Sequence, residues 1–253
     1  MKKLLITTFL LLFFSSIHST PQIGDLLIYK GDTVSVYPLI LEKYISGRSD
    51  NSIIREKIKD IIIPSTACWH GYRTLYEIRN DSLFLIKAYG KRNINLSAIF
   101  GKEGNIFIDW YTGTLTSPRN MLMYDHNNWW GGYYEYETDF RIEGGILKSV
   151  REYHNYVRPT IYTNQDTLMN FIKSNIDYNN VKATGQKVRV LTRIDDVDNN
   201  GKITKVSVVK GHDGYNEEAV RVIKSIPQWQ VIIRRGEKEH IYWSVPVLFD
   251  EKN

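Results

Sequence analysis

A cysteine and a histidine lie two positions apart in the stretch ACWHGY, and Cys68 and His70 are residue types that nucleophilic catalysis uses. A thiol beside an imidazole becomes an active site only when nucleophile, base and orienting group meet in space. No feature of the sequence fixes that geometry here. Cys68 is the only cysteine of the chain, and we interpret it as a buried apolar residue. We therefore expect no catalytic residue and no enzyme.

An acidic turn resembles half of a calcium-binding loop. Asp196, Asp198, Asn200 and Gly201 match the start of the EF-hand pattern, which places oxygen ligands at its positions 1, 3 and 5 and a bidentate glutamate at position 12. Counted from Asp196, the twelfth residue is Ser207, which lies in a predicted strand. The pattern therefore favours a solvated hairpin turn, and we expect no metal and no cofactor.

Aromatic residues gather in the stretch YDHNNWWGGYYEY. Tyrosine and tryptophan give rigid contact area at low entropic cost, which favours them at binding surfaces. The alternative is an aromatic-rich loop without a ligand. The candidate ligand surface consists of Trp129, Trp130, Tyr133 and Tyr134. We infer no small-molecule substrate.

The composition is that of a globular protein. The chain has 253 residues, of which 42% are hydrophobic and 24% charged, and a formal net charge of +5. From residue 181 onward there are 13 Lys and Arg against 10 Asp and Glu. This mild excess lacks the dense basic stripe of nucleic-acid-binding proteins, so no nucleic-acid partner is expected.

Residues 1–20 have the order of a secretory signal peptide: Lys2 and Lys3, then an apolar run over 4–14, then small and polar residues. The run is shorter than the roughly 20 residues that cross a bilayer. We expect cleavage and a location in the periplasm or cell envelope. An uncleaved inner-membrane anchor is the alternative.

The sequence predicts an α+β protein with a mostly antiparallel β body over 21–160, either a sandwich or a partly closed barrel. Alternating runs predict hairpins that turn near Gly31-Asp32, Asn80-Asp81 and Gly144-Gly145. Residues 41–63 are the one helical region of this body, with isoleucines at helical spacing.

Residues 161–253 predict a small two-layer domain in the order helix, strand, strand, helix, strand. Asp166 is the expected N-cap of the first helix and Asn216 that of the second, which Pro227 ends. Runs over 187–194 and 203–210 predict a hairpin. The last strand, over 241–249, contains Pro246, and because proline lacks an N–H we expect this strand at a sheet edge.

Several short motifs in this region resemble the C-terminal domain of TonB, the energy transducer of Gram-negative outer-membrane transport. The resemblance covers about residues 165–250, whereas we recognise no family in the body. The motifs are Gly185-x-x-Val188, Gly201-Lys202, Val209-Lys210-Gly211, Glu218-Ala219, Pro227-x-Trp229 and Val245-Pro246-Val247-x-Phe249.

The resemblance implies a periplasmic domain that binds the N-terminal segment of an outer-membrane transporter by adding it as a strand to the sheet edge. The same edge could pair two copies into a homodimer. The residues expected on the docking edge are His240, Tyr242, Ser244, Pro246 and Leu248, and the motif residues expected to support the fold are Gly201, Glu218, Ala219, Pro227, Trp229 and Phe249.

Two departures from the family keep a second hypothesis open. The family's N-terminal helix carries a serine and a histidine one turn apart, whereas Ser15 and His18 lie three apart at the end of a short apolar run. The family's proline-rich spacer is replaced by the β body. The protein is therefore either a TonB-like adaptor or an envelope β-domain binding protein whose TonB-like module is a structural or assembly domain.

Overall fold

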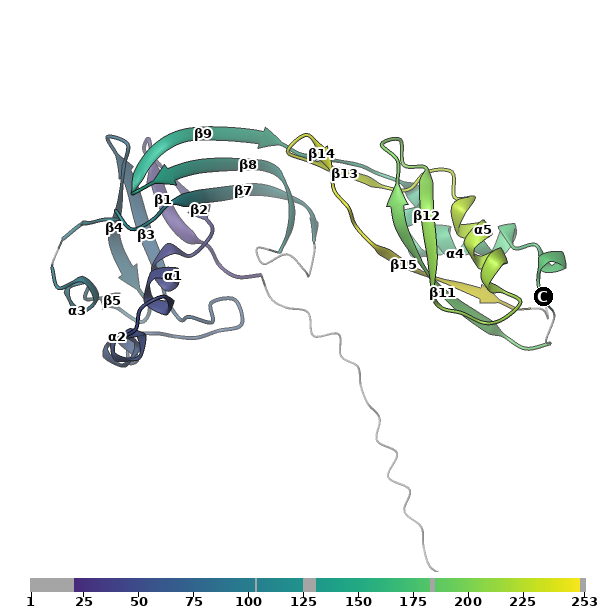
Figure 1. Ribbon diagram of the computed structural model, residues 1–253, viewed down its shortest axis with the longest axis horizontal. Helices are drawn as coiled ribbons and strands as arrows, with labels where there is room; N and C mark the ends of the chain where they lie inside the picture. Colours follow the sequence, from purple (N-terminus) through teal and green to yellow (C-terminus); the bar gives the residue numbers. More distant parts are fainter. Residues whose placement is uncertain (1–20, 103, 125–130, 183–184, 251–253) are drawn as a thin grey trace, which may run out of the picture. The chain divides into compact units, whose positions relative to one another are not determined.

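The computed structural model describes residues 21–102, 104–124, 131–182 and 185–250 (Figure 1). The fold is a mixed α+β fold, as expected, with 45% strand and five α-helices among the described residues. The sheets do not close into a barrel, and the sandwich and the partly closed barrel expected for the body stay predictions. No described helix is long and apolar enough to span a membrane.

The chain forms two compact units. Among the described residues, the first comprises those up to 108 together with 124 and 131–132, and the second comprises 109–123 and those from 133 to 250. The expected domain boundary after residue 160 falls inside the second unit and stays a prediction.

The first unit contains a sheet with strand order β2-β1-β3-β4. Strands β1 (Asp25–Tyr29) and β2 (Asp32–Val36) form the first predicted hairpin, and β3 (Arg73–Arg79) and β4 (Ser82–Tyr89) form the second. Asn80 and Asp81 both adopt positive φ, which a two-residue hairpin turn requires. Strand β1 pairs with β3 in parallel, so the body is not purely antiparallel. Two short strands, β5 (Asn93–Ile94) and β6 (Ile106–Phe107), pair with β4.

Helices α1 (Ile40–Ser46) and α2 (Asn51–Ile58) connect β2 to β3 and lie where the helical region was predicted. Such a crossover is what a parallel pair of strands needs. Ile54 and Ile58 are buried, whereas Ile53 is exposed. The short helix α3 (Ser97–Phe100) follows β5.

The second unit begins with three long strands, β7 (Gly113–Tyr124), β8 (Gly132–Glu143) and β9 (Ile146–His154), in the order β9-β8-β7. They run side by side as a curved ribbon (Figure 1). The β8–β9 hairpin turns at Gly144 and Gly145, as predicted, and both glycines have positive φ.

The C-terminal sheet has the order β12-β11-β15, with β11 (Val188–Val197), β12 (Ile203–Lys210) and β15 (Trp243–Phe249). Helices α4 (Gln165–Asn175) and α5 (Asn216–Lys224) complete this layer pair. The single-turn helices η1 (Ile161–Thr163) and η2 (Tyr178–Asn180) flank α4. The shared core consists of Ile172, Val188, Val190, Ile194, Ala219, Val222, Ile223, Val245, Val247 and Phe249, with other buried side chains around them.

Both predicted helix caps of this region are wrong. Helix α4 is capped by Asn164, whose side chain accepts from the Thr167 N–H, and Asp166 lies in the first turn. Helix α5 has no side-chain N-cap, because Asn216 is already its first residue. The side chain of Asn216 instead accepts from the N–H of His212.

A third sheet was not predicted. Strand β10 (Tyr156–Arg158) pairs with β13 (Val231–Arg234), which pairs with β14 (Glu237–Lys238). Strands β13 and β14 therefore lie between α5 and β15, where the sequence predicted no strand. Arg235 and Gly236 form the β13–β14 turn, both with positive φ.

Candidate functional site

Strand β15 lies at one edge of the C-terminal sheet and pairs antiparallel with β11. The hydroxyl of Thr192 donates to the carbonyl of Val245 at 2.7 Å, so this carbonyl points toward β11. Backbone groups of successive residues point to alternate sides of a strand. The backbone groups of Ser244, Pro246 and Leu248 therefore point away from β11, along what we call the outward edge.

The outward edge explains the proline. Pro246 has no N–H, and the structure places it where no described strand pairs with β15 on that side. The prediction of an edge strand is confirmed. Ser244 and Leu248 each offer an N–H and a carbonyl, whereas Pro246 offers only a carbonyl. Leu248 is 49% exposed and Ser244 is also exposed, so no other described residue buries these two side chains.

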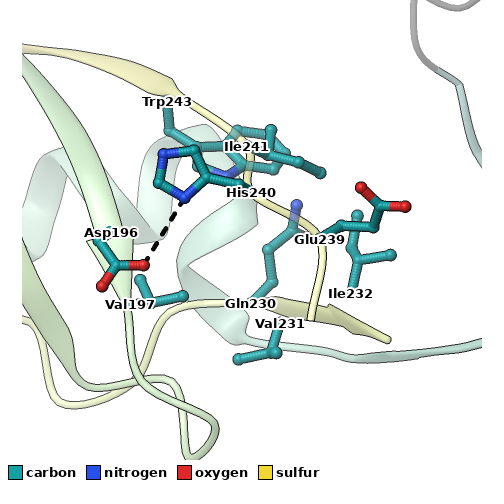
Figure 2. Close-up of a pocket in the computed structure, with 9 residues that line it drawn as sticks. All are labelled: Asp196, Val197, Gln230, Val231, Ile232, Glu239, His240, Ile241 and Trp243. Atoms are coloured by element: carbon teal, nitrogen blue, oxygen red, sulfur yellow. Dashed lines mark ion pairs between the residues drawn. The ribbon is translucent and has the colours of Figure 1, made fainter. Parts of the chain in front are cut away.

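Two residues expected on the docking edge lie outside the strand. His240 and Tyr242 precede β15, which begins at Trp243. Trp243 is also the first residue of β15 that pairs with β11, where it lies opposite Ile194. His240 Nδ1 lies 3.8 Å from the carboxylate of Asp196, beside a cavity of about 10 Å³ that holds at most one water (Figure 2). The strand is therefore shorter than the docking edge that the sequence predicted, because pairing with β11 begins only at Trp243.

A groove of about 280 Å³ adjoins the outward edge. We call it the α4 groove, because it lies between β15 and the η1–α4 segment. Most of its wall is apolar. The main lining residues are Tyr162, Leu168, Met169, Trp229, Trp243 and Pro246, and Ser244 also lines it.

The motif residues Gly201 and Trp229 link the β11–β12 turn to the chain segment that follows α5. The Trp229 N–H donates to the Gly201 carbonyl at 2.7 Å. Trp229 is 3% exposed, and its ring meets that of Trp243 edge-on at 6.1 Å. Pro227 is exposed and follows the end of α5 at Lys224, as predicted. These residues support the fold beside the α4 groove.

Glu218 is a buried carboxylate with a structural role. Arg221 donates to both of its oxygens, at 2.6 and 2.7 Å, and the N–H of Asp177 donates at 2.6 Å. Burial by itself would raise the pKa of Glu218, but these donors outweigh it and lower the pKa. Ala219 and Phe249 are fully buried in the core. None of these residues faces the α4 groove.

The Cys68–His70 pair is buried in the first unit, and the prediction of a buried cysteine is confirmed. The Cys68 sulfur lies 3.7 Å from His70 Nε2 and donates to the Tyr72 carbonyl at 3.2 Å. Burial raises the pKa of Cys68 and lowers that of His70. Burial therefore favours the neutral thiol and the neutral imidazole, whereas an activated cysteine nucleophile is a thiolate with a lowered pKa.

The aromatic surface is only partly described. Trp129 and Trp130 lie outside the described residues. Tyr133 is buried, at 8% exposure, and Tyr134 is half-buried. The expectation that Tyr133 offers contact area at the surface is therefore wrong.

The acidic turn uses its carboxylates within the chain. Asp198 accepts from the N–H groups of Asn200 and Lys202, at 2.8 and 2.9 Å. Asp196 pairs with Lys238 at 2.8 Å and accepts from the hydroxyl of Thr204. These bonds are those of a closed hairpin turn.

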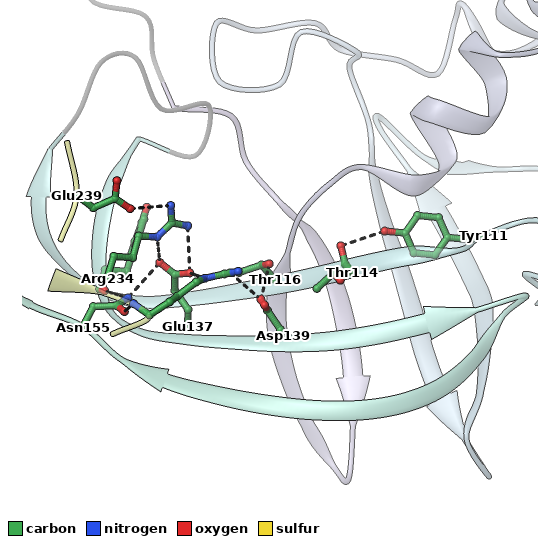
Figure 3. Close-up of polar contacts among 10 residues, drawn as sticks. Tyr111, Thr114, Thr116, Glu137, Asp139, Asn155, Arg234 and Glu239 are labelled. Atoms are coloured by element: carbon green, nitrogen blue, oxygen red, sulfur yellow. Dashed lines mark hydrogen bonds and ion pairs between the residues drawn. The ribbon is translucent and has the colours of Figure 1, made fainter. Parts of the chain in front are cut away.

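Sequence reasoning missed a buried ionic cluster around Glu137 of β8 (Figure 3). Glu137 is 2% exposed and accepts from Arg234 at 2.6 Å and from Arg235 at 2.8 Å. The Arg235 guanidinium also pairs with Asp139 at 2.9 Å. The backbone N–H of Arg235 donates to the side-chain carbonyl of Asn155. The cluster joins β8 to the β13–β14 turn. No local pattern signals it, because its partners lie about a hundred residues apart.

The chain was compared with models of protein families, with curated proteins and with solved structures, and none of the three comparisons found a match.

Proposed function

We propose that residues 161–253 form a TonB-like binding module that docks an extended partner segment as an additional strand on the outward edge of β15. The observation that carries the proposal is the row of outward backbone groups at Ser244, Pro246 and Leu248. An edge of this kind is a template for another strand, whose main-chain hydrogen bonds give affinity and whose side chains give selectivity. The order of sequence motifs supports the same proposal.

The proposed partner is the N-terminal segment of an outer-membrane transporter, and the proposed location is the periplasm or cell envelope. Both rest on the resemblance and on the signal-like residues 1–20. Mass spectrometry of the N-terminus of the protein from its native host tests the location. A cleaved signal gives a chain beginning near residue 21, which an inner-membrane motor could not drive. An intact residue 1 in the inner-membrane fraction would instead favour an anchored energy transducer.

A second candidate function is an envelope β-domain binding protein in which the same module is structural. The Glu137 cluster favours it, because buried ion pairs tie the β13–β14 turn to the β7–β9 sheet. A module held in this way differs from one that hangs on a long spacer. In this case the outward edge would pair with an assembly partner and would transmit no force.

A pair of substitutions at Ser244 tests the docking edge. Ser244→Pro removes one outward N–H, and because that N–H points away from β11 the ladder inside the sheet is retained. Ser244→Ala keeps the N–H and removes only the hydroxyl. Binding of N-terminal peptides from transporters of the same organism is measured with the melting temperature of each variant.

Strand docking predicts that the alanine variant binds nearly as wild type, while the proline variant binds at least about tenfold more weakly at a similar melting temperature. A folded proline variant that binds as well as wild type would show that the docking strand lies elsewhere. If wild type binds no transporter peptide, the structural alternative is favoured.

A further inference from the structure

We propose that the α4 groove and the arginines of β11 select the docked segment, so that it alternates bulky apolar residues on one face with acidic residues on the other. This inference rests on the proposed function and specifies the chemistry of the partner. In this proposal the groove binds a side chain of the added strand and so selects its type.

The position of the groove follows from the pleat of the sheet. Side chains of Val245 and Val247 point toward the helices and are buried there. Neighbouring strands keep the same alternation, so every second residue of a docked strand would also point to the helix side. That side of the outward edge is the α4 groove, because the inward residue Val245 lines it together with Leu168 and Met169 of α4.

The size of the groove fits one or two side chains. Its volume of about 280 Å³ lies just below the range of about 300–1,000 Å³ that small-molecule sites occupy. Two indole rings and the apolar residues Leu168 and Met169 form much of its wall, and no charged residue lines it. A leucine or a larger apolar side chain would be transferred from water into the groove, whereas an alanine side chain would fill only a small part of it.

The opposite face of the edge is basic. On β11, Arg193 lies opposite Ser244 and Arg189 lies opposite Leu248, both on the face away from the helices. Arg189 has no ion-pair partner among the described residues, while Arg193 is paired with Asp195 at 2.6 Å. A docked strand would lie about 10 Å from β11, so carboxylates on its outer face would be attracted by a screened charge. The acidic preference should therefore be weaker than the apolar one.

A second copy of β15 does not fit this site. Its inward residues Val245 and Val247 are already buried in their own core and could not also fill a neighbour's groove. In a two-fold pair centred on Pro246, the two proline carbonyls would face each other with no N–H between them. The occupant is therefore an extended segment that is not already part of a sheet.

Three synthetic peptides of eight residues with blocked ends test the inference on the full chain. The first alternates glutamate with leucine, the second glutamate with alanine, and the third lysine with leucine. Binding is measured by fluorescence anisotropy at two salt concentrations. We expect the first peptide to bind at least about tenfold more tightly than the second, and a few-fold more tightly than the third, with the latter difference smaller at high salt.

Two variants show where the preference arises. Gln165→Trp, at an exposed position that lines the groove, should fill it and remove the preference for leucine over alanine without unfolding the core. Asn170→Trp, at an exposed position of the same helix that does not line the groove, is the matched control and should keep the preference.

Wild type that binds the leucine and alanine peptides equally would overturn this inference and leave the proposed function intact. The same holds if Gln165→Trp keeps the full leucine preference. A tighter lysine peptide would overturn the charge selection. If no peptide binds and the transporter peptides also fail, the proposed function falls and this inference with it.

Discussion

Gly201 and Trp229 meet backbone to backbone: the Trp229 N–H donates to the Gly201 carbonyl at 2.7 Å, and a Cβ built on Gly201 would come within 3.0 Å of the Trp229 carbonyl oxygen. Gly201 has φ +87°, a conformation that other residues rarely adopt. The β11–β12 turn and the chain after α5 are therefore locked together at a point that only glycine fits.

Gly201→Ala should accordingly destabilise the protein by about 1–3 kcal/mol, because it adds both an unfavourable φ and a contact with rigid backbone. Urea denaturation of the two proteins measures the difference. Gly185→Ala is a suitable comparison, since its φ is also positive but no atom lies within 4 Å of the added Cβ. Equal losses at the two glycines would show that the close approach to Trp229 contributes nothing.

Trp229→Ala should cost about 3–5 kcal/mol, the range for removing a buried aromatic ring. The ring is 3% exposed, and its indole nitrogen has no hydrogen-bond partner among the described residues, so its contribution comes from packing. Trp229→Phe keeps part of the packing and should cost clearly less. A melting temperature unchanged by the alanine substitution would mean that the ring is not part of the core.

The acidic turn should not bind calcium. Its carboxylates are engaged by backbone N–H groups and by Lys238, which suits a hairpin turn. Millimolar calcium or a chelator should therefore leave the melting temperature unchanged. A ligand that binds only the native state must stabilise it by mass action, so an upward shift with calcium would contradict this interpretation.

These results show which parts of the structure the sequence could predict. Turns such as Asn80-Asp81 and Gly144-Gly145 were found because a hairpin turn needs residues that tolerate positive φ, and the proline of β15 marked its edge. The start of β15 was missed, because the alternation continues back to Ile241 although pairing with β11 ends at Trp243. Alternation describes which way side chains point, not where hydrogen bonding stops.

The unpredicted parts depend on contacts between distant segments. Strand β13 has four residues and is a strand only because β10 and β14 pair with it. The ion pairs of Glu137 with Arg234 and Arg235 likewise join residues that are remote in the sequence. For the docking edge, local patterns found Ser244, Pro246 and Leu248, while the α4 groove required the placement of η1 and α4 beside β15.

Asp25 should make the stability of the first unit fall as the pH rises from about 4 to 7. Complete burial raises its pKa to about 6 from 3.8, although Thr74 and Tyr76 donate to it and oppose the shift. A pKa raised in the folded state adds stability below the unfolded value, and this is lost as the pH rises through the folded value. The rise of the Asp25 pKa from 3.8 to about 6 corresponds to about 3 kcal/mol of stability at most.

Chemical denaturation of wild type and Asp25→Asn between pH 4 and pH 7.5 measures this effect. The variant cannot ionise, so its stability relative to wild type should increase over that range. Asp32→Asn, at an exposed position of β2, is the control. A difference between wild type and Asp25→Asn that does not change with pH would contradict the raised pKa.

Glu137→Gln should destabilise the second unit by about 3–5 kcal/mol, because it leaves Arg234 and Arg235 without their shared buried counter-charge. Burial alone would raise the pKa of Glu137, but the two arginines outweigh it and lower the pKa. Its stabilising contribution is therefore present above the unfolded pKa and lost as the pH falls through the folded value, so the cost of Glu137→Gln should shrink in acid.

The control is Glu143→Gln, which breaks an exposed pair with Arg141 on the same strand and should cost at most about 1 kcal/mol. Urea denaturation at pH 7 and pH 4, with hydrogen exchange of β13 and β14, measures both effects. If Glu137→Gln costs no more than Glu143→Gln and leaves the protection of β13 unchanged, the cluster does not hold the β13–β14 turn to β8, and the structural alternative for the module loses its support.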